Sequence, residues 1–385
     1  MSFQTVEIII TIVKTFIVFV ALMSMVPVMI WLERKVIADI QVRIGPNRAG
    51  PFGILQPIAD AIKLFLKEDI IARDADKLVY FLAPAASIAP AIIAFAVVPF
   101  GDQFTMFGHR IVMQVADINI GILYILALSS LAVYGIVLAG WSSNNKYSLL
   151  GGIRSSAQMI SYELPLGVAL VGPILLSGSL TLRDMVDAQA RAGVWFIAPQ
   201  FLAFVCYIIS GFAETNRAPF DLPEAEQELT AGYHTEYSSF RFAMFFMAEY
   251  INMVTVTAIA TTIFLGGWRG PFSNIVILQP VWFLVKVFAL LYVMIWVRGT
   301  LPRVRYDKLM RFGWKILLPI SLINLLITAA VKAFAPQSAI PVLSAISISL
   351  AILVAVALAI ASARSARLLP SGKPEPKGEF YGWRS

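Results

Sequence analysis

Four ionisable residues interrupt long apolar stretches of this 385-residue chain and are the first candidates for chemistry: Lys14, Glu163, Glu249 and Lys286. A charge at the centre of a bilayer is costly, so each residue needs a partner or a function there. Lys14 lies near the end of its stretch, where a long side chain can reach the membrane surface. Lys286 lies deeper, and we expect it to be a counter-charge near mid-membrane.

Glu163 and Glu249 each lie seven or eight residues into an apolar stretch, which corresponds to about 10–12 Å along a helix. Glu214 ends a third stretch on the same side of the membrane. The spacing therefore predicts three carboxylates from three helices near one membrane surface, where a proton path could begin. The alternative is a set of hydrogen-bonded structural groups.

The segment from Glu214 to Glu236 contains six carboxylates and one arginine. Such a composition is unfavourable beside an anionic membrane surface. Crowded carboxylates raise one another's pKa, as proton-handling groups require. We expect a folded site rather than a solvated acidic loop or a loop that docks a basic partner. The acidic residues that follow the arginine most closely are Asp221, Glu224, Glu226 and Glu228.

An earlier loop begins after Trp31 and contains a run rich in glycine and proline at 45–53, which predicts a tight, irregular backbone. The residues from Ile54 to Lys67 then place apolar side chains on one helical face, opposite Asp60 and Lys63. Such a helix either rests on lipid headgroups or forms a doorway for an amphipathic ligand at the membrane surface.

The composition of the chain predicts the kind of helices that position these residues. Apolar residues make up 59% of the chain and charged residues 14%, and the mean hydropathy is +0.79. Continuous apolar runs exclude a β-barrel. We expect an all-α polytopic membrane protein with about nine transmembrane helices plus the amphipathic interfacial helix. The nine stretches are Ile8–Trp31, Leu78–Phe100, Ile118–Trp141, Ala157–Ser179, Val194–Ala213, Phe242–Trp268, Ile275–Val297, Trp314–Val331 and Ala339–Ala363.

The distribution of lysine and arginine predicts the orientation of the chain across the membrane. The segments after odd-numbered spans contain 23 of them and those after even-numbered spans contain 5. Positive charge stays in the cytoplasm, which predicts an inner-membrane protein with a periplasmic N-terminus and a cytoplasmic C-terminus. The net charge of +7 is thus a topology signal, and we expect no nucleic-acid partner. The loops on the periplasmic side are expected to be short and plain.

The chain is expected to form one transmembrane domain over residues 1–363, followed by a cytoplasmic, disordered tail at 364–385. Its functional loops are placed at 32–77, 142–156, 214–241 and 298–313. The lone Cys206 excludes an internal disulfide and any cysteine-ligated metal centre within this chain. No phosphate loop or dinucleotide-binding motif is present. We expect no redox cofactor in this chain, so electrons must come from another polypeptide.

Several strings, in order and at the expected spacing from roughly residue 8 to 331, carry a family resemblance. They are Leu32–Lys35, Arg43–Arg48, Gln56–Lys63, Ser161–Glu163, Glu214–Leu222, Met247–Tyr250 and Pro302–Asp307. With these strings the chain resembles one family of membrane subunits of the proton-translocating NADH:quinone oxidoreductase (respiratory complex I), the family that includes mitochondrial subunit 1. The family pattern has eight spans, so the ninth span and the basic tail depart from it.

The resemblance implies a membrane protein that helps to enclose a quinone chamber and couples quinone reduction to proton translocation. It implies hydrophilic partner subunits that carry FMN and iron–sulfur clusters, antiporter-like membrane partners, and lipid. The quinone-binding residues it implies are Glu33, Arg34, Arg43, Asp60, Lys63, Arg298, Arg303 and Arg305. The coupling residues it implies are Glu163, Glu214, Asp221, Glu224, Glu226, Glu228 and Glu249.

Two alternatives remain open. The first is the equivalent membrane subunit of a related hydrogenase-type or formate-oxidising complex, although the full Arg43–Arg48 loop favours the quinone enzyme. The second is a secondary transporter, a class that usually shows an internal repeat. No repeat of fixed period is found in this chain.

Overall fold

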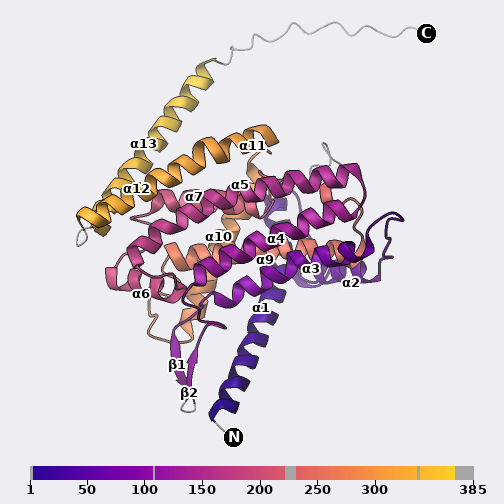
Figure 1. Ribbon diagram of the computed structural model, residues 1–385, viewed down its shortest axis with the longest axis horizontal. Helices are drawn as coiled ribbons and strands as arrows, with labels where there is room; N and C mark the ends of the chain where they lie inside the picture. The colour runs from indigo at the N-terminus through magenta and orange to yellow at the C-terminus, as the bar shows by residue number, and fades with distance from the viewer. Residues whose placement is uncertain (1–2, 107–108, 222–230, 336–338, 369–385) are drawn as a thin grey trace.

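The computed structural model describes residues 3–106, 109–221, 231–335 and 339–368, and within these ranges it is helical apart from one antiparallel hairpin. Figure 1 shows the long helices lying alongside one another, with the free ends of α1 and α13 pointing away from the bundle. The helices are α1 (Phe3–Ile40), α2 (Gln56–Leu66), α3 (Lys77–Ala94), α4 (Gly121–Ser142), α5 (Lys146–Ser177), α6 (Leu182–Ala192), α7 (Phe201–Glu214), α9 (Ser239–Phe264), α10 (Leu278–Thr300), α11 (Tyr306–Phe312), α12 (Leu318–Phe334) and α13 (Ala339–Leu368). Shorter elements are the 3₁₀ turns Pro51–Gly53, Phe95–Val97 and Gly232–His234, the π-turn Gly313–Leu317, and the strands β1 (Gln103–Met106) and β2 (His109–Val112).

Among the described residues, seven helical segments are long and apolar enough to cross a membrane, and there are shorter apolar helices as well, which confirms the all-α polytopic class. The fifth expected span is shorter than predicted, because 194–200 forms turns and α7 begins only at Phe201. The ninth corresponds to α13. Since α13 continues to Leu368, the first five residues of the expected tail are helical. Residues 369–385 lie outside the described ranges.

The central helices pack in a continuous series: α3 lies along α4, α4 along α5, α5 along α7 and α12, and α9 against α3 and α10. The absence of a side chain at Gly135 permits the closest approach, since a Cβ there would lie 2.1 Å from the Ser87 hydroxyl. Small residues serve this purpose in membrane bundles. By contrast, the outer half of α1 leaves Ile8, Ile12 and Phe16 about three-fifths exposed, as expected for a surface that faces lipid.

The bundle has two different ends. We call one the charged face, which carries α2 and the segments 41–55, 215–221, 231–238 and 301–305, and the other the hairpin face, which carries β1, β2 and α6 (Figure 1). The hairpin-face loops were expected to be short and plain, and this was wrong. Thr181 and Gly193 cap α6 at its two ends, and Arg183 pairs with Asp102 at 2.5 Å.

The expectation for Lys286 was also wrong. Its ammonium donates to the carbonyl oxygens of Leu265, Gly267 and Arg269 at 2.6–2.9 Å, at the hairpin end of α9, rather than to a carboxylate. These carbonyls are free because the chain leaves the helix there. Lys14 likewise reaches the carbonyl of Gln114 at 3.1 Å. Both lysines therefore stabilise the hairpin face.

The expected loop at 142–156 is mostly helix. The Asn145 side chain accepts a hydrogen bond from the Tyr147 amide at 2.9 Å, and this N-cap starts α5 at once. Only a short link therefore joins α4 to α5. As a result, Arg154 near the charged face and Glu163 within the bundle lie on the same rigid helix.

Candidate functional site

The best-buried group of charges connects three helices and a loop just beneath the charged face. We call it the arginine-bridged cluster: Glu33 from α1, Arg217 from the segment after α7, Glu249 from α9 and Arg298 from α10. Glu33, Arg217 and Glu249 are at most 7% exposed. Buried charges persist only when they are paired and hydrogen-bonded, so these four residues depend on one another.

Glu33 is held from two sides. Its carboxylate contacts the guanidinium of Arg298 directly and accepts a hydrogen bond from the Tyr250 hydroxyl at 2.7 Å. Arg217 lies 4.0 Å away from the same carboxylate. The resemblance implies that Glu33 and Arg298 bind quinone, and in the structure the two side chains are paired with each other.

Arg217 joins the two acidic members of the cluster. One of its guanidinium nitrogens lies 3.4 Å from a carboxylate oxygen of Glu249, and the guanidinium stacks over the Tyr250 ring at 4.3 Å. The Tyr233 hydroxyl donates to the other Glu249 oxygen at 3.4 Å. Two carboxylates and two guanidiniums balance in charge, so protonation or movement of any one member changes the electrostatics of the others.

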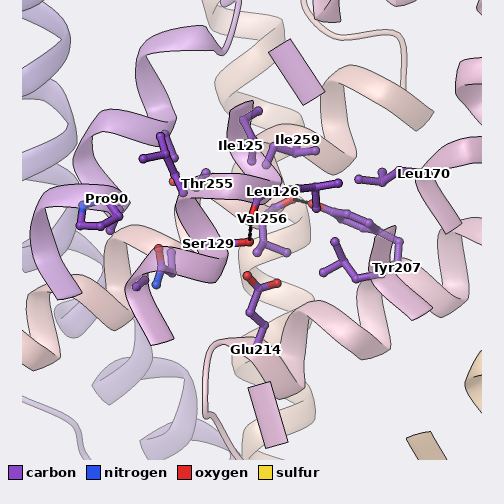
Figure 2. Close-up of a pocket in the computed structure, with 16 residues that line it drawn as sticks. Pro90, Ile125, Leu126, Ser129, Leu170, Tyr207, Glu214, Thr255, Val256 and Ile259 are labelled. Atoms are coloured by element: carbon purple, nitrogen blue, oxygen red, sulfur yellow. Dashed lines mark hydrogen bonds between the residues drawn. The ribbon is translucent and has the colours of Figure 1, made fainter. Parts of the chain in front are cut away.

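Beyond Glu249, two small cavities continue into the bundle. The first, about 20 Å³, is lined by Glu249, Asn252 and Glu214. The second, about 30 Å³, is lined by Glu214, Asn252 and Ser129 among mainly apolar side chains. A cavity of this size and polarity can hold a water molecule. Figure 2 shows the Glu214 carboxylate pointing into the second cavity, towards the Ser129 hydroxyl.

Glu163 follows Glu214. Its carboxylate accepts a hydrogen bond from the Ser130 hydroxyl and is close enough to that of Glu214 for the two to repel each other. The structure thus brings the three predicted glutamates together and adds Glu33 to them. We call the series Glu33, Glu249, Glu214 and Glu163 the carboxylate row, which runs through α1, α9, α7 and α5.

The two residues that precede Glu163 are hydrogen-bonded to segments near the charged face. On the same helix, the Tyr162 hydroxyl donates to the Leu309 carbonyl at 2.9 Å, and the Ser161 hydroxyl accepts from the Trp314 indole at 3.2 Å. Trp314 belongs to the π-turn between α11 and α12. Irregular helical turns of this type often occur at functional sites.

A second, more exposed group of charges lies between α1 and α2. Arg34 pairs with Asp60 at 2.6 Å, and Lys63 lies 3.5 Å from the same carboxylate. Partial burial alone would raise the pKa of Asp60, but the hydrogen bond and positive charge of Arg34 outweigh it and hold the pKa below its usual value. We call these three residues the surface triad.

The amphipathic helix was predicted correctly, and it is α2. Its apolar face remains about half exposed at Ile58, Ile62 and Phe65. The far end is fixed to α9, since Phe65 stacks on Phe240 at 4.5 Å and the Ser239 hydroxyl donates to the Leu64 carbonyl at 2.9 Å. The helix therefore presents an apolar surface beside the surface triad.

In the part of the chain that the structure describes, the remaining predicted arginines belong to neither the cluster nor the triad. Arg43 donates to the Gln41 side chain at 2.6 Å, Arg305 lies 3.4 Å from Asp307, and Arg303 is exposed on the charged face. Asp221 is half-buried at the end of a described range. Glu224, Glu226 and Glu228 lie outside the described residues. Of the predicted arginines, only Arg34 reaches Asp60.

Arg217 was missed as a site residue, although its position gives a signal: it is the one arginine among six carboxylates. His234 was noticed but given no role. It is buried against Tyr233, Phe242 and Phe245. Burial first, and then the charge of Arg217, lowers the pKa of His234 to about 3, so it stays neutral at ordinary pH. Within the described ranges, no group of three potential metal ligands is present.

The sequence of the chain matches those of known proteins. A family model described as NADH dehydrogenase matches residues 13–329. A Geobacter sulfurreducens protein named as a subunit of NADH-quinone oxidoreductase is 54% identical over 322 residues, which cover 83% of this chain and 96% of that protein. A Thermomicrobium roseum protein named as the same type of subunit is 53% identical over 326 residues, covering 82% of this chain and 94% of that protein. The match of the family model and of these relatives over most of the sequence leads to one conclusion: the chain belongs to the NADH dehydrogenase family.

Proposed function

We propose that this chain forms part of a quinone chamber at the charged face. When quinone is reduced in the chamber, the change of charge there acts on the carboxylate row. The chain is a membrane subunit of an NADH–quinone oxidoreductase, a proton-translocating enzyme with several subunits. The observation that carries the proposal is the continuity of the row, from Glu33 beside Arg298 to Glu163 beside Ser130. This family membership favours the quinone enzyme over a hydrogenase-type complex or a transporter.

The overall reaction sets the charges that the chamber must handle. Two electrons from NADH and two protons convert a quinone to a quinol, and partner subunits with FMN and iron–sulfur clusters deliver the electrons. Reduction places negative charge on the quinone oxygens before protons arrive. Fixed guanidiniums stabilise such charge without giving up protons. Arg34, Arg43, Arg303 and Arg305 are the arginines at the charged face that we assign to this task, with Asp60 and Lys63 beside Arg34.

The arginine-bridged cluster supplies the link to proton movement. Negative charge at the chamber attracts Arg217 and Arg298 and weakens their hold on Glu249 and Glu33. A carboxylate that loses its guanidinium in a buried site binds a proton more readily. Glu249 can then pass a proton to Glu214 through a water in the cavity between them, and Glu214 can pass it on to Glu163. From Glu163 the proton leaves towards antiporter-like partners.

Asp221, Glu224, Glu226 and Glu228 belong to this proposal as the acidic segment that follows Arg217. In the sequence they lie four to eleven positions after the bridging arginine. We propose that they receive protons as quinol forms, which changes the position of Arg217.

The same proposal places the charged face in the cytoplasm of a cell with an inner membrane. Segments that carry basic residues cluster at this face, and the positive-inside preference supports the orientation. A C-terminal reporter that is active only in the periplasm would contradict it. The single transmembrane domain and the cytoplasmic tail are proposed on the same basis.

Arg34→Ala tests the quinone-chamber assignment in the assembled complex. We expect quinone reduction to fall about 10- to 150-fold, the equivalent of losing roughly 1.5–3 kcal/mol of charge stabilisation in the transition state. NADH oxidation by an artificial acceptor should survive, because that acceptor takes electrons upstream. An equal loss of both activities would indicate failed assembly, and unchanged quinone reduction would remove Arg34 from the site.

A further inference from the structure

An open hollow of about 580 Å³ lies at the charged face, where α11 and the π-turn meet the segment that contains Pro219. Its walls are mainly apolar, from Phe220 and Leu301 on one side to Phe312 and Ile316 on the other. The Val304 amide donates to the Pro219 carbonyl at 3.0 Å, so the two segments that form the hollow are joined at its base. The hollow is therefore formed by backbone segments that are hydrogen-bonded to each other.

Three cations line this hollow: Lys308, Arg311 and Lys315. All three side chains are exposed. The nearby carboxylate of Asp307 pairs with Arg305 instead, at 3.4 Å. None of the three cations forms an ion pair with a carboxylate in the part of the chain that the structure describes. The hollow thus combines an apolar interior with three positive charges that no described carboxylate compensates.

The hollow also lies at the depth of lipid headgroups. The apolar segment that can cross the membrane begins at Tyr306, so the three cations fall within its first ten residues. Trp314, in the same stretch, remains 49% exposed. Exposed tryptophan near a span end is typical of the boundary between water and hydrocarbon. Ile316, which lines the hollow and lies two residues further along the same segment, is 46% exposed.

We propose that the hollow binds one anionic phospholipid of the bilayer, with its phosphate between Lys308, Arg311 and Lys315 and an acyl chain against Phe312 and Ile316. A free phosphate ion would leave the apolar walls in water, and a zwitterionic lipid would leave the net positive charge uncompensated. An anionic phospholipid satisfies both requirements. Because the hollow joins the segments at 219–220 and 301–304, the bound lipid braces the two loops of the charged face. The hollow adjoins Arg303 and Arg305 in sequence, but its lining includes none of the residues assigned to the quinone chamber, and lipid binding there needs no quinone.

Lipid retention in the intact purified complex tests the proposal. Lys308→Gln, Arg311→Gln and Lys315→Gln are combined in one variant. The matched control combines Arg73→Gln, Lys77→Gln and Lys146→Gln, which remove three exposed cations of the same face away from the hollow. Each basic residue near an anionic surface contributes a factor of about five, so the first variant should bind phosphatidylglycerol roughly 100-fold more weakly. Mass spectrometry after detergent washing should find one fewer anionic lipid per complex in this variant only. Equal retention in both variants would overturn the proposal.

A photoreactive substitution identifies the occupant even if the triple variant fails to assemble. Ile316→p-benzoylphenylalanine, in complex placed in vesicles of phosphatidylcholine with or without phosphatidylglycerol, should crosslink mainly to phosphatidylglycerol. Equal crosslinking to both lipids would overturn the role of the three cations. Crosslinking to a partner subunit would show that a protein fills the hollow and would also overturn the proposal.

Discussion

The arginine-bridged cluster and the surface triad use the same pairing of arginine with carboxylate, yet they differ in what the pairing can do. In the triad, the Arg34 side chain is 45% exposed and Asp60 has its charge partly screened by water. In the cluster, Arg217 is 2% exposed and lies between two buried carboxylates. Water screens the first arrangement, whereas the second changes energy strongly when one charge moves. Burial therefore distinguishes the two groups, which supports our proposal that the triad positions a ligand and the cluster transmits a change of charge.

The largest effect should come from breaking the cluster at its bridge. Arg217→Gln leaves Glu249 without its guanidinium and weakens the pairing of Glu33, which costs about 3–5 kcal/mol for a buried pair. We expect little assembled complex, measured by the yield of NADH-oxidising particles after purification. The double variant Arg217→Gln/Glu249→Gln should recover much of that yield, because neither charge remains unpaired. A double variant no better than the single one would show that Arg217 acts through packing alone.

A smaller effect should come from His234, which lies beside the cluster but stays neutral. The low pKa of His234 in the folded protein means that the unfolded chain binds more protons between about pH 3 and pH 6.5, so stability falls as pH falls through this range. At pH 5.5 this costs about 1.4 kcal/mol relative to pH 7.5. His234→Phe should lose less stability on this acidification, as measured by thermal inactivation of the complex. An unchanged pH dependence would show that His234 is protonated in the folded state.

The smallest effect on stability should come from the surface triad. Asp60→Asn removes a partly exposed pair, for which the typical contribution is about 0–1 kcal/mol. Because Arg34 holds the pKa of Asp60 below its usual value, its pairing is complete above the ordinary aspartate range and is lost only as pH falls through the folded-state pKa. We expect the thermal midpoints of variant and wild type to differ little and equally from pH 6 to pH 8. A difference that grows across this range would contradict the assignment.

The sequence predicted the elements better than the contacts between them. The spans could be predicted because hydrocarbon requires continuous apolar helices, and α2 because its apolar positions recur at helical spacing. The helix α6 was missed, although Thr181 and Gly193 are residues that commonly cap a helix. Hydropathy does not reveal α6, because this helix is short and amphipathic rather than continuously apolar.

Spacing predicted which buried carboxylates lie together, but not the partners of the buried cations. Glu163, Glu214 and Glu249 were grouped correctly because each lies at a similar depth in its own helix. Arg217 and Lys286 could not be assigned partners, since these partners depend on how the backbone turns at 215–217 and 265–269. For Lys286 the partners are carbonyl oxygens, which every residue has and no sequence pattern marks.

Proton pumping by Glu163→Gln and Glu249→Gln, alone and combined, tests the carboxylate row most directly. Glutamine keeps the shape of the side chain and removes the titratable proton. Arg217 retains Glu33 as a carboxylate neighbour, so the complex should assemble, although in lower yield, and proton transfer is measured per electron. In proteoliposomes the double variant should move few protons per electron, while Glu68→Gln, which removes an exposed carboxylate outside the row, should pump like the wild type. Normal proton transfer in the double variant would contradict the account and show that these glutamates are structural.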